Sequence, residues 1–466
     1  MSKLFPHRPN DSKRYAILGA TAILPDRCIE NAYVEWSEGI LSRIGPMPKR
    51  IPKSLESLEA SGSYIAPGWI DIHVHGGAGA DFMDGTLEAI QTACRSHLKH
   101  GTTTIFPTTT TGSHESILRM IQAVEATKRS ADTSMPSIEG VHLYGPYFTP
   151  EKSGCHRKEA CRAPVRSEFE EYFQAGSIAI ATCAAELDGC ANFYRYAKKQ
   201  GCLVTCGHSN SSWNEMAAAH KCGMSHVDHF WCAMSSVASV RTRLGTPMQG
   251  SMLEFVLAHP TMSTEVIADG YHLAPELLEF AWQMKKSSML CLVSDTSRAL
   301  DMPPGRYAFG HPEENVWIES TGKVGLSPAG GLASSVVALD HCVRHMAKVT
   351  KIPLWEIVRM ATLTPAERTG IAADRGSLEA GKRADLLLLD KRLQVQKVFY
   401  TSPSSIALAP HNRSALGDRL PPRHIPPHRL GNLFEDRQAT AVSPLEILLG
   451  EDLLDGPPSH GVNIDQ

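Results

Sequence analysis

Two histidines one residue apart stand at the end of an apolar run, in the segment Pro67-Gly68-Trp69-Ile70-Asp71-Ile72-His73-Val74-His75-Gly76. Because side chains alternate between the faces of a β-strand, His73 and His75 point the same way. Two neutral imidazoles that converge on one point make half of a site for zinc, with iron or manganese as alternatives. A surface strand with two solvated histidines would give the same pattern. The apolar lead-in and the following Gly76-Gly77 favour a buried strand that delivers its last side chains to a site.

The composition is that of an ordinary globular protein. The chain has 466 residues, of which 42% are hydrophobic and 20% charged, and a formal net charge of −3. That charge offers no basic stripe for nucleic acid or for an anionic membrane, and no run of about 18 apolar residues occurs. The start, Met1 to Arg14, is polar and basic without an apolar signal core. We therefore expect a soluble, cytoplasmic protein that binds neither nucleic acid nor a membrane.

Cysteine and histidine are used differently along the chain. The 12 cysteines are scattered and form no Cys-x-x-Cys pair, so we expect buried thiols in a reducing compartment rather than disulfides. The 21 histidines are many for this length, and several stand at the ends of predicted strands. Histidine is therefore the residue type that indicates chemistry here.

Short apolar runs alternate with helical patterns between about residues 65 and 369. The predicted strands are Trp69–Ile72, Thr103–Phe106, Ile138–Leu143, Ile178–Ala181, Leu203–Cys206, His226–Asp228, Thr264–Ile267 and Leu290–Val293. The predicted helices are Thr86–His100, Ser113–Ser130, Cys190–Gln200, Trp213–Cys222, Pro275–Lys285 and Val336–Thr350. Eight strands with intervening helices over about 300 residues match the size of a TIM-like (β/α)8 barrel in the α/β class. A doubly wound open sheet is the alternative, but it wants a glycine-rich phosphate turn, and His-x-His-Gly-Gly is a poor one.

The two ends of the chain flank this central part. Tyr15 to Ile44 has short alternating segments broken by Pro25-Asp26 and Gly39, which is a β-hairpin pattern, and a matching piece follows at 376–399. We therefore expect one small β-domain built from both ends. The predicted boundaries are a polar leader at 1–14, the β-domain at 15–64 and 374–400, the barrel at 65–373, and a proline-rich, mostly irregular tail at 401–466.

Functional side chains of a barrel lie at the carboxyl ends of its strands. The polar residues predicted there are His73, His75, His142, Tyr144, His208, His229, Asp269, His272 and Asp295. Imidazoles from several strands plus one late aspartate form a shell for one or two divalent ions and leave an open position for water. The ion would lower the pKa of that water and polarise a carbonyl, while a carboxylate would move the proton. Asp295, at the end of the last strand, is the candidate carboxylate.

Eight ordered blocks carry a family resemblance. They read PGWIDIHVHGGAGADFMD, HLYGPYFTPEKSGCH, CGHSNSS, HFWCAM, IADGYHL, LCLVSDT, MATLTPAERTGI and GSLEAGKRADLLLLD. In this order they resemble the N-acetylglucosamine-6-phosphate deacetylase family of the amidohydrolase superfamily, from about Tyr15 to Phe399. The resemblance implies a barrel with a small β-sandwich from both chain ends, metal-dependent deacetylation of an amino sugar phosphate, and a homodimer.

The resemblance also implies roles for individual residues. His208 and His229 match the principal metal ligands, and His73 and His75 match the ligands of a second ion. Asp295 matches the general acid and base, and is a metal ligand if the ion shifts toward it. The residues that match substrate contacts are Cys155, His156, Cys232, Ala233, Arg241, Arg243, Asp269, His272, Ala329 and Gly330. Among these, His272 is expected to stabilise the oxyanion near the scissile carbonyl and is counted with Asp295 as catalytic.

Three positions depart from the family pattern. Tyr144 stands where the family has a metal-binding glutamate, and a neutral phenol is a poor ligand. The ion could shift toward His73, His75 and Asp295, or binding could fail; Tyr144 itself could donate a hydrogen bond to substrate or only fill space. Second, Cys232-Ala233 replaces Asn-Ala.

The third departure concerns the phosphate. The segment around Arg241 and Arg243 replaces Arg-Glu-Pro-Gly, so that these arginines are either a phosphate clamp or part of a solvated loop. The sequence predicts a hydrolase that removes the N-acetyl group of N-acetylglucosamine 6-phosphate or a close relative. The alternatives are an amidohydrolase for another N-acyl substrate and a catalytically silent sugar-binding homologue.

Overall fold

The structure, a computed structural model, describes residues 4–7, 13–130, 132 and 134–401. Within these residues the central part of the chain is built on two parallel sheets, with strand orders β13-β12-β9 and β14-β15-β16-β17-β18-β19. The strands are β9 (Trp69–Val74), β12 (Thr102–Pro107), β13 (Ser137–Ile138), β14 (Val141–Leu143), β15 (Ile178–Thr182), β16 (Leu203–Cys206), β17 (His226–Val227), β18 (Ser263–Ile267) and β19 (Leu290–Val293).

The two parallel sheets adjoin at both edges. On one side Thr108, just after β12, forms a parallel bridge to His142 of β14. On the other side the amide of Asp295, just after β19, donates to the carbonyl of His73 in β9 at 2.9 Å. The sheet is therefore curled, as in a TIM-like barrel, and the carboxyl ends of its strands meet on one side.

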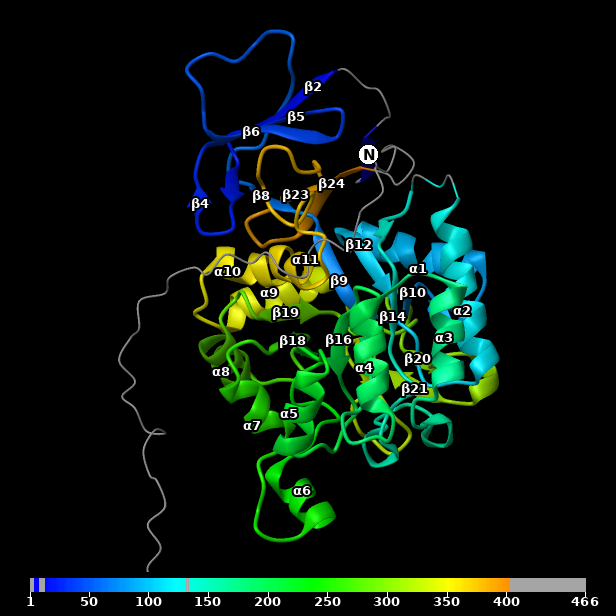
Figure 1. Cartoon of the computed structure of the whole chain (residues 1–466). Coiled ribbons are helices and arrows are strands. Elements are labelled where there is room, and N and C mark those ends of the chain that lie inside the picture. The colour runs from blue at the N-terminus through cyan, green and yellow to red at the C-terminus, as the bar shows by residue number, and fades with distance from the viewer. Residues whose placement is uncertain (1–3, 8–12, 131, 133, 402–466) are drawn as a thin grey trace, which may run out of the picture. The chain divides into compact units, whose positions relative to one another are not determined.

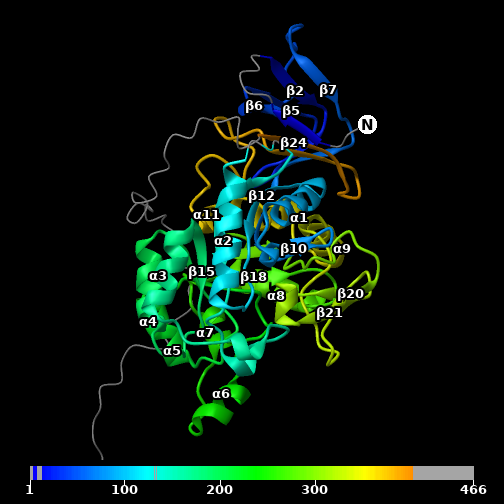
Figure 2. The ribbon, with the colours of Figure 1, turned by 90° about the vertical axis from the view of Figure 1, so that its right-hand side faces the viewer.

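Helices alternate with these strands and line the outside of the sheet, as Figures 1 and 2 show for α1 to α4. They are α1 (Leu87–Lys99), α2 (His114–Lys128), α3 (Arg166–Ala175), α4 (Cys190–Lys199), α5 (Trp213–Lys221), α6 (Val237–Leu244), α7 (Met252–Ala258), α8 (Pro275–Lys285), α9 (Leu339–Val349), α10 (Leu354–Met360) and α11 (Leu363–Arg368). Serine and threonine caps fix several of their starts: Ser212 and Glu215 form a capping box at α5, and Ser251 and Glu254 form one at α7.

Two further sheets come from the chain ends, with orders β1-β24-β23-β8-β3-β4 and β6-β5-β2-β7. Their strands are β1 (Leu4–His7), β2 (Arg14–Leu18), β3 (Thr21–Ile23), β4 (Cys28–Ile29), β5 (Ala32–Ser37), β6 (Ile40–Pro46), β7 (Glu56–Glu59), β8 (Tyr64–Pro67), β23 (Leu386–Leu389) and β24 (Val395–Thr401). Buried Ile17, Val34, Trp36 and Leu386 pack together in one core cluster. The prediction that both ends share one small β-unit is confirmed, because β23 pairs with β8, which also pairs with β3. Strand β1, which pairs with β24, lies in the predicted polar leader, where no strand was expected.

Several details differ from the sequence prediction. The expected strand Ile138–Leu143 is divided into β13 and β14 by Gly140, whose φ of 150° is a conformation that favours glycine. An additional antiparallel sheet, β20 (Gly305–Ala308), β21 (Trp317–Ser320) and β22 (Gly325–Leu326), follows β19. The predicted tail lies outside the described residues beyond Thr401, and the domain boundaries stay predictions. No helix in the described part of the chain is long and apolar enough to cross a bilayer.

Candidate metal centre and active site

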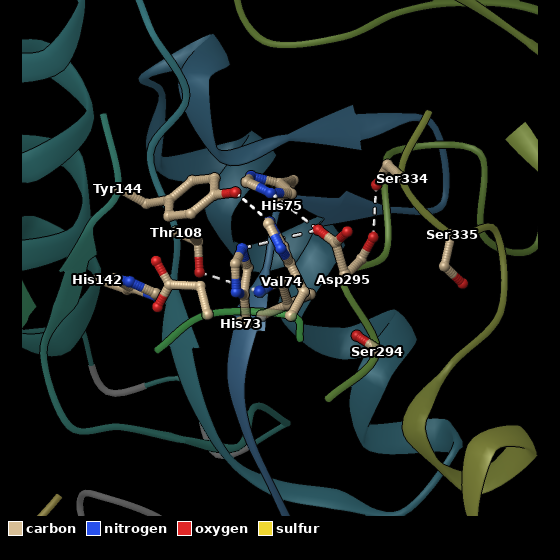
Figure 3. A network of polar contacts seen from close by, with 12 residues as sticks. His73, Val74, His75, Thr108, His142, Tyr144, Ser294, Asp295, Ser334 and Ser335 are labelled. Atoms are coloured by element: carbon tan, nitrogen blue, oxygen red, sulfur yellow. Dashed lines mark hydrogen bonds and ion pairs between the residues drawn. The ribbon is translucent and has the colours of Figure 1, made fainter. Parts of the chain in front are cut away.

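Strand β9 places the two predicted histidines at the carboxyl end of the parallel sheet. Every residue of β9 is buried, and His73 and His75 are 0% and 1% exposed. Asp295, which follows β19, faces both rings, and Figure 3 shows His73, His75 and Asp295 grouped together. The prediction that β9 is a buried strand rather than a surface strand is confirmed.

The geometry of this group fits a divalent cation. Oδ1 of Asp295 lies 3.1 Å from Nε2 of His75 and 3.7 Å from Nε2 of His73. Ligand atoms around a tetrahedral zinc ion are about 3.4 Å apart, since each bond is about 2.1 Å long. Nε2 of His73 is buried and has no hydrogen-bond partner, and the same holds for Nδ1 of His75. His73, His75 and Asp295 therefore form a buried three-donor group that could hold a metal ion.

Glu265 in β18 orients His73. Its Oε2 lies 2.9 Å from Nδ1 of His73 and accepts the amide of His229 at 3.2 Å, while Oε1 lies 3.3 Å from Nε2 of His226. A proton on Nδ1 of His73 leaves the Nε2 lone pair for the cation, which is the second-shell arrangement common at metal sites. Burial opposes a charged ring, but Glu265 and Asp295 outweigh it and raise the pKa of His73 to about 9, so a cation that binds Nε2 at neutral pH would displace a proton from it. The sequence analysis missed Glu265.

Asp295 is held rigidly. Besides its amide contact with His73, its carbonyl accepts from the amide of Ser335 at 2.8 Å and from the hydroxyl of Ser334. Burial disfavours the carboxylate, but a hydrogen bond from His75 and the nearby charge of His73 hold the pKa of Asp295 well below its usual range. Asp295 is therefore a carboxylate at neutral pH.

His208 and His229 reach the same space from the ends of β16 and β17, with ring centroids 5.2 Å apart. Nδ1 of His208 donates to the carbonyl of Lys152 at 2.6 Å, so a neutral His208 carries its lone pair on Nε2. Nε2 of His229 is hydrogen-bonded to the hydroxyl of Tyr144. The three-donor groups found in the described residues contain neither histidine. Their predicted role as metal ligands stays a prediction.

The backbone around the site is strained. His208, Trp231, Ala233 and Asp295 have φ values of 46°, 72°, 49° and 47°, in the left-handed region that costs a non-glycine residue roughly 1–3 kcal/mol. All four line one cavity. Such conformations persist only where surrounding contacts fix them, so this strain is evidence that the loops are built to hold side chains in place.

A cavity of about 290 Å³ opens onto this group of residues. Its lining consists of His75, Tyr144, Gly154, Cys155, His156, His208, His229, Trp231, Cys232, Ala233, His272, Asp295, Phe309, Leu332 and Ser334. The predicted substrate residues Cys155, His156, Cys232, Ala233 and His272 are thus brought together. Trp231, Phe309, Leu332 and Ser334 were not predicted, because they come from irregular loops and from the β20–β22 region.

Hydrogen bonds orient two of the histidine rings that line the cavity, His272 and His156. Nδ1 of His272 lies 2.8 Å from Oδ2 of Asp269, so its other nitrogen is left for the cavity. Burial opposes the charged ring, but the hydrogen bond to Asp269 outweighs it and raises the pKa of His272. Nδ1 of His156 accepts the amide of Thr111 at 3.4 Å, which places the proton of a neutral His156 on Nε2.

Five predicted substrate residues are not in the cavity lining. One of them, Asp269, contacts His272, and the other four lie elsewhere. Arg241 and Arg243 are exposed on α6, which projects from the rest of the chain in Figures 1 and 2. Arg243 makes a forked ion pair with Glu215, one arm being 3.0 Å long. Ala329 and Gly330 form an exposed turn outside the cavity lining. The structure does not bring these four to the cavity, and their predicted substrate contact stays a prediction.

A buried polar network supports the floor of the site. Oδ2 of Asp228 lies 3.0 Å from the hydroxyl of Thr182, which lies 2.9 Å from Nε2 of His142. Burial and the charge of Glu265 raise the pKa of Asp228 to about 8. The hydroxyl of Thr182 donates to Oδ2 of Asp228, and Nδ1 of His142 donates to the carbonyl of Ile72 at 2.9 Å. His73, Asp228 and Glu265 form a second three-donor group, but the carboxylate oxygens of Asp228 and Glu265 are already hydrogen-bonded.

Comparison with known proteins agrees with this architecture. The sequence profile of the amidohydrolase family matches residues 64–410. The chain is 30% identical over 377 residues to N-acetylglucosamine-6-phosphate deacetylase of Bacillus subtilis, covering 80% of this chain and 92% of the relative. It is 29% identical to N-acetylgalactosamine-6-phosphate deacetylase of Escherichia coli, covering 80% and 94% of the two chains.

Solved structures are similar as well. N-acetyl-D-glucosamine-6-phosphate deacetylase of Mycobacterium smegmatis, in complex with N-acetyl-D-glucosamine-6-phosphate, matches with a TM-score of 0.75 at 23% identity, over 84% of this chain and 98% of that one. The enzyme of Pasteurella multocida matches with a TM-score of 0.75 at 24% identity, over 82% and 97%. These likenesses confirm the fold.

Proposed function

Because this chain belongs to the amidohydrolase family, we propose that it hydrolyses the N-acetyl amide of an amino sugar. The observation that carries this proposal is the buried group of His73, His75 and Asp295, whose donor atoms are spaced for a divalent cation beside a cavity of about 290 Å³. The relatives that support the acetyl group and the sugar are deacetylases of two N-acetylhexosamine 6-phosphates.

His73, His75 and Asp295 would hold the cation, with Glu265 fixing the proton on Nδ1 of His73. A cation bound there supplies Lewis-acid polarisation of the acyl carbonyl and of the attacking water. Zinc is the first choice for two imidazoles and a carboxylate, with iron and manganese as alternatives. The adjoining sheets support a closed (β/α)8 barrel around the site, beside a β-sandwich formed by the chain ends.

Asp295 is the proton carrier of the proposed reaction. Its carboxylate lies beside His73 and His75 and lines the cavity, so it can accept a proton from the attacking water and then deliver that proton to the departing amine. The contact with Asp269 raises the pKa of His272 and so favours the doubly protonated ring, which would donate from Nε2 to the carbonyl oxygen as negative charge develops there. The backbone hydrogen bonds of Asp295 with His73, Ser334 and Ser335 keep its carboxylate in place for both transfers.

N-acetylglucosamine 6-phosphate is the first candidate substrate because of the relatives. One observation favours a second candidate, an N-acyl substrate without a phosphate: among the described residues that line the cavity, none is lysine or arginine. Fixed guanidinium groups are the usual means of holding a phosphate. Arg241 and Arg243 could serve only if α6 approached the cavity, from the same chain or from a second copy in the homodimer that the family resemblance implies.

The test is acetate release by the purified protein from N-acetylglucosamine and N-acetylgalactosamine, each with and without the 6-phosphate. We expect release from at least one of the four, abolished by a chelator and restored by zinc, iron(II) or manganese. A higher kcat/KM for the phosphorylated forms would select the first candidate. No acetate from any of them, with about one cation bound per chain, would overturn the proposed activity.

A further inference from the structure

We infer that Tyr144 limits the metal centre to a single divalent cation and leaves His208 and His229 facing the substrate. This inference rests on the proposed metal-dependent function. It concerns the number of cations and the role of the two histidines, neither of which follows from the hydrolysis itself.

The phenol ring of Tyr144 fills the space between two sets of histidines. Tyr144 follows β14 and is 1% exposed. Its ring centroid lies 4.3 Å from that of His73 and 5.4 Å from that of His208. Figure 3 shows the ring extending toward His73 and His75. A cation between His208 and His229 would have to share this volume with the ring.

The hydroxyl of Tyr144 also occupies a histidine nitrogen that could otherwise bind a cation. It is hydrogen-bonded to Nε2 of His229, and Nδ1 of His229 is buried without a partner. Because a neutral phenol is a poor ligand, this side of the cavity offers two imidazole nitrogens, Nε2 of His208 and Nδ1 of His229, and no three-donor group among the described residues includes either ring. Catalytic sites for zinc use three protein ligands, and the group with open donor atoms is His73, His75 and Asp295 on the other side.

The free nitrogen of His208 has a defined chemical character. Since its Nδ1 donates to the carbonyl of Lys152, Nε2 of a neutral His208 is an acceptor on the cavity wall. Gly154 makes this ring position available, because a Cβ there would lie 3.2 Å from Cε1 of His208. An acceptor at this place suits a sugar hydroxyl or the amide N–H of the substrate. We therefore expect His208 to affect KM and not cation binding.

A carboxylate in place of the phenol would complete a second cation site at His208 and His229. Glutamate at position 144 removes the ring and places an anionic donor next to His208 and His229, whose ring centroids are 5.2 Å apart. One carboxylate and two imidazoles are a complete catalytic ligand set. The Tyr144→Glu variant should therefore bind a second cation, whereas Tyr144→Phe, which keeps the ring and adds no anion, should not.

The experiment measures the cation content of the dialysed full-length chain by mass spectrometry, with circular dichroism to verify folding. We expect about one equivalent in the wild type and in Tyr144→Phe, and about two in Tyr144→Glu. In the Tyr144→Glu background, adding His75→Ala should leave about one equivalent, held on the side of His208 and His229. In the wild-type background, His75→Ala should lose the cation.

Two equivalents in the wild type or in Tyr144→Phe would overturn the inference, as would one equivalent in a folded Tyr144→Glu chain. If Tyr144→Glu does not fold, His208→Ala and His229→Ala decide instead. Each should keep about one equivalent, and His208→Ala should raise KM; loss of the cation in either would overturn the inference. A wild-type chain without any cation would overturn the proposed function, which distinguishes the two failures.

Discussion

Oε2 of Glu265 lies 2.9 Å from Nδ1 of His73, with both side chains completely buried. The pair links the centre of β18 to the carboxyl end of β9, where the candidate metal donors lie. A carboxylate in this position fixes both the tautomer and the orientation of the imidazole, and it raises the basicity of the opposite nitrogen. The affinity of the proposed site for a cation would therefore be set partly by a residue that does not contact it.

The first prediction concerns this pair. Glu265→Gln should weaken cation binding by about 10–100-fold, because a neutral amide orients His73 less well and does not raise its basicity. Calorimetric titration with zinc measures the change. Glu254→Gln, which alters the capping box of α7, is the matched control and should keep the wild-type affinity. Equal affinities in wild type and Glu265→Gln would show that His73 is not a ligand.

The second prediction tests the proton carrier. Asp295→Asn keeps the shape of the side chain but cannot accept a proton, so kcat for acetate release should fall by about 10²–10⁴-fold. Because Asp295 is also a proposed ligand, cation content must be measured on the same sample, and activity compared at saturating cation. Asp188→Asn, away from the cavity lining, is the control. Activity within a few-fold of wild type at saturating cation would exclude Asp295 as the general base.

The third prediction compares the loss of His272 with the loss of the Asp269 carboxylate that orients it. His272→Ala should lower kcat by about 10²–10³-fold with cation content unchanged, because it removes a donor to the developing oxyanion. Asp269→Asn should have a smaller effect on kcat, since it only loosens the ring through the 2.8 Å contact, and should lower the pKa seen in the pH–rate profile. Loss of the cation from His272→Ala would show a structural role instead.

Much of the fold could be predicted because its strands are short, apolar and bounded by turn residues. β16 and β19 coincide with the predicted Leu203–Cys206 and Leu290–Val293. The short helix α7 was missed, although Ser251 and Glu254 provide a capping-box signal for its start. The additional sheet β20–β22 was missed because its strands have only two to four residues, which is too short for an alternating pattern to be recognised.

The site could be predicted only where side chains lie at strand ends. His73, His75 and Asp295 meet that condition and converge as expected. Glu265 lies at the centre of β18 and not at its end, so the one available signal in the sequence is an acidic residue inside a predicted strand. The contact between Tyr144 and His229 joins positions 85 residues apart, so its geometry depends on the packing of two strand ends and has no local signature.

The last prediction is independent of the metal and concerns stability against pH. Nε2 of His100, after α1, lies 2.9 Å from Asp301, and Nδ1 lies 3.4 Å from Asp340. Burial opposes the charged ring, but hydrogen bonds to both carboxylates outweigh it and raise the pKa of His100 to about 9.

A folded-state pKa above the unfolded value of about 6.5 means that the protonated ring stabilises the fold below about pH 6.5, and that this stabilisation is lost as pH rises toward 9. The free energy of unfolding, from urea denaturation, should therefore fall by on the order of 1–3 kcal/mol between pH 6.5 and 9.5. His100→Gln should make this fall smaller than in wild type, and the remainder belongs to other groups such as His73, whose pKa is also about 9. His114→Gln, which breaks a contact between α2 and Glu171, should retain the whole fall. The same fall in His100→Gln as in wild type would assign the effect to another group.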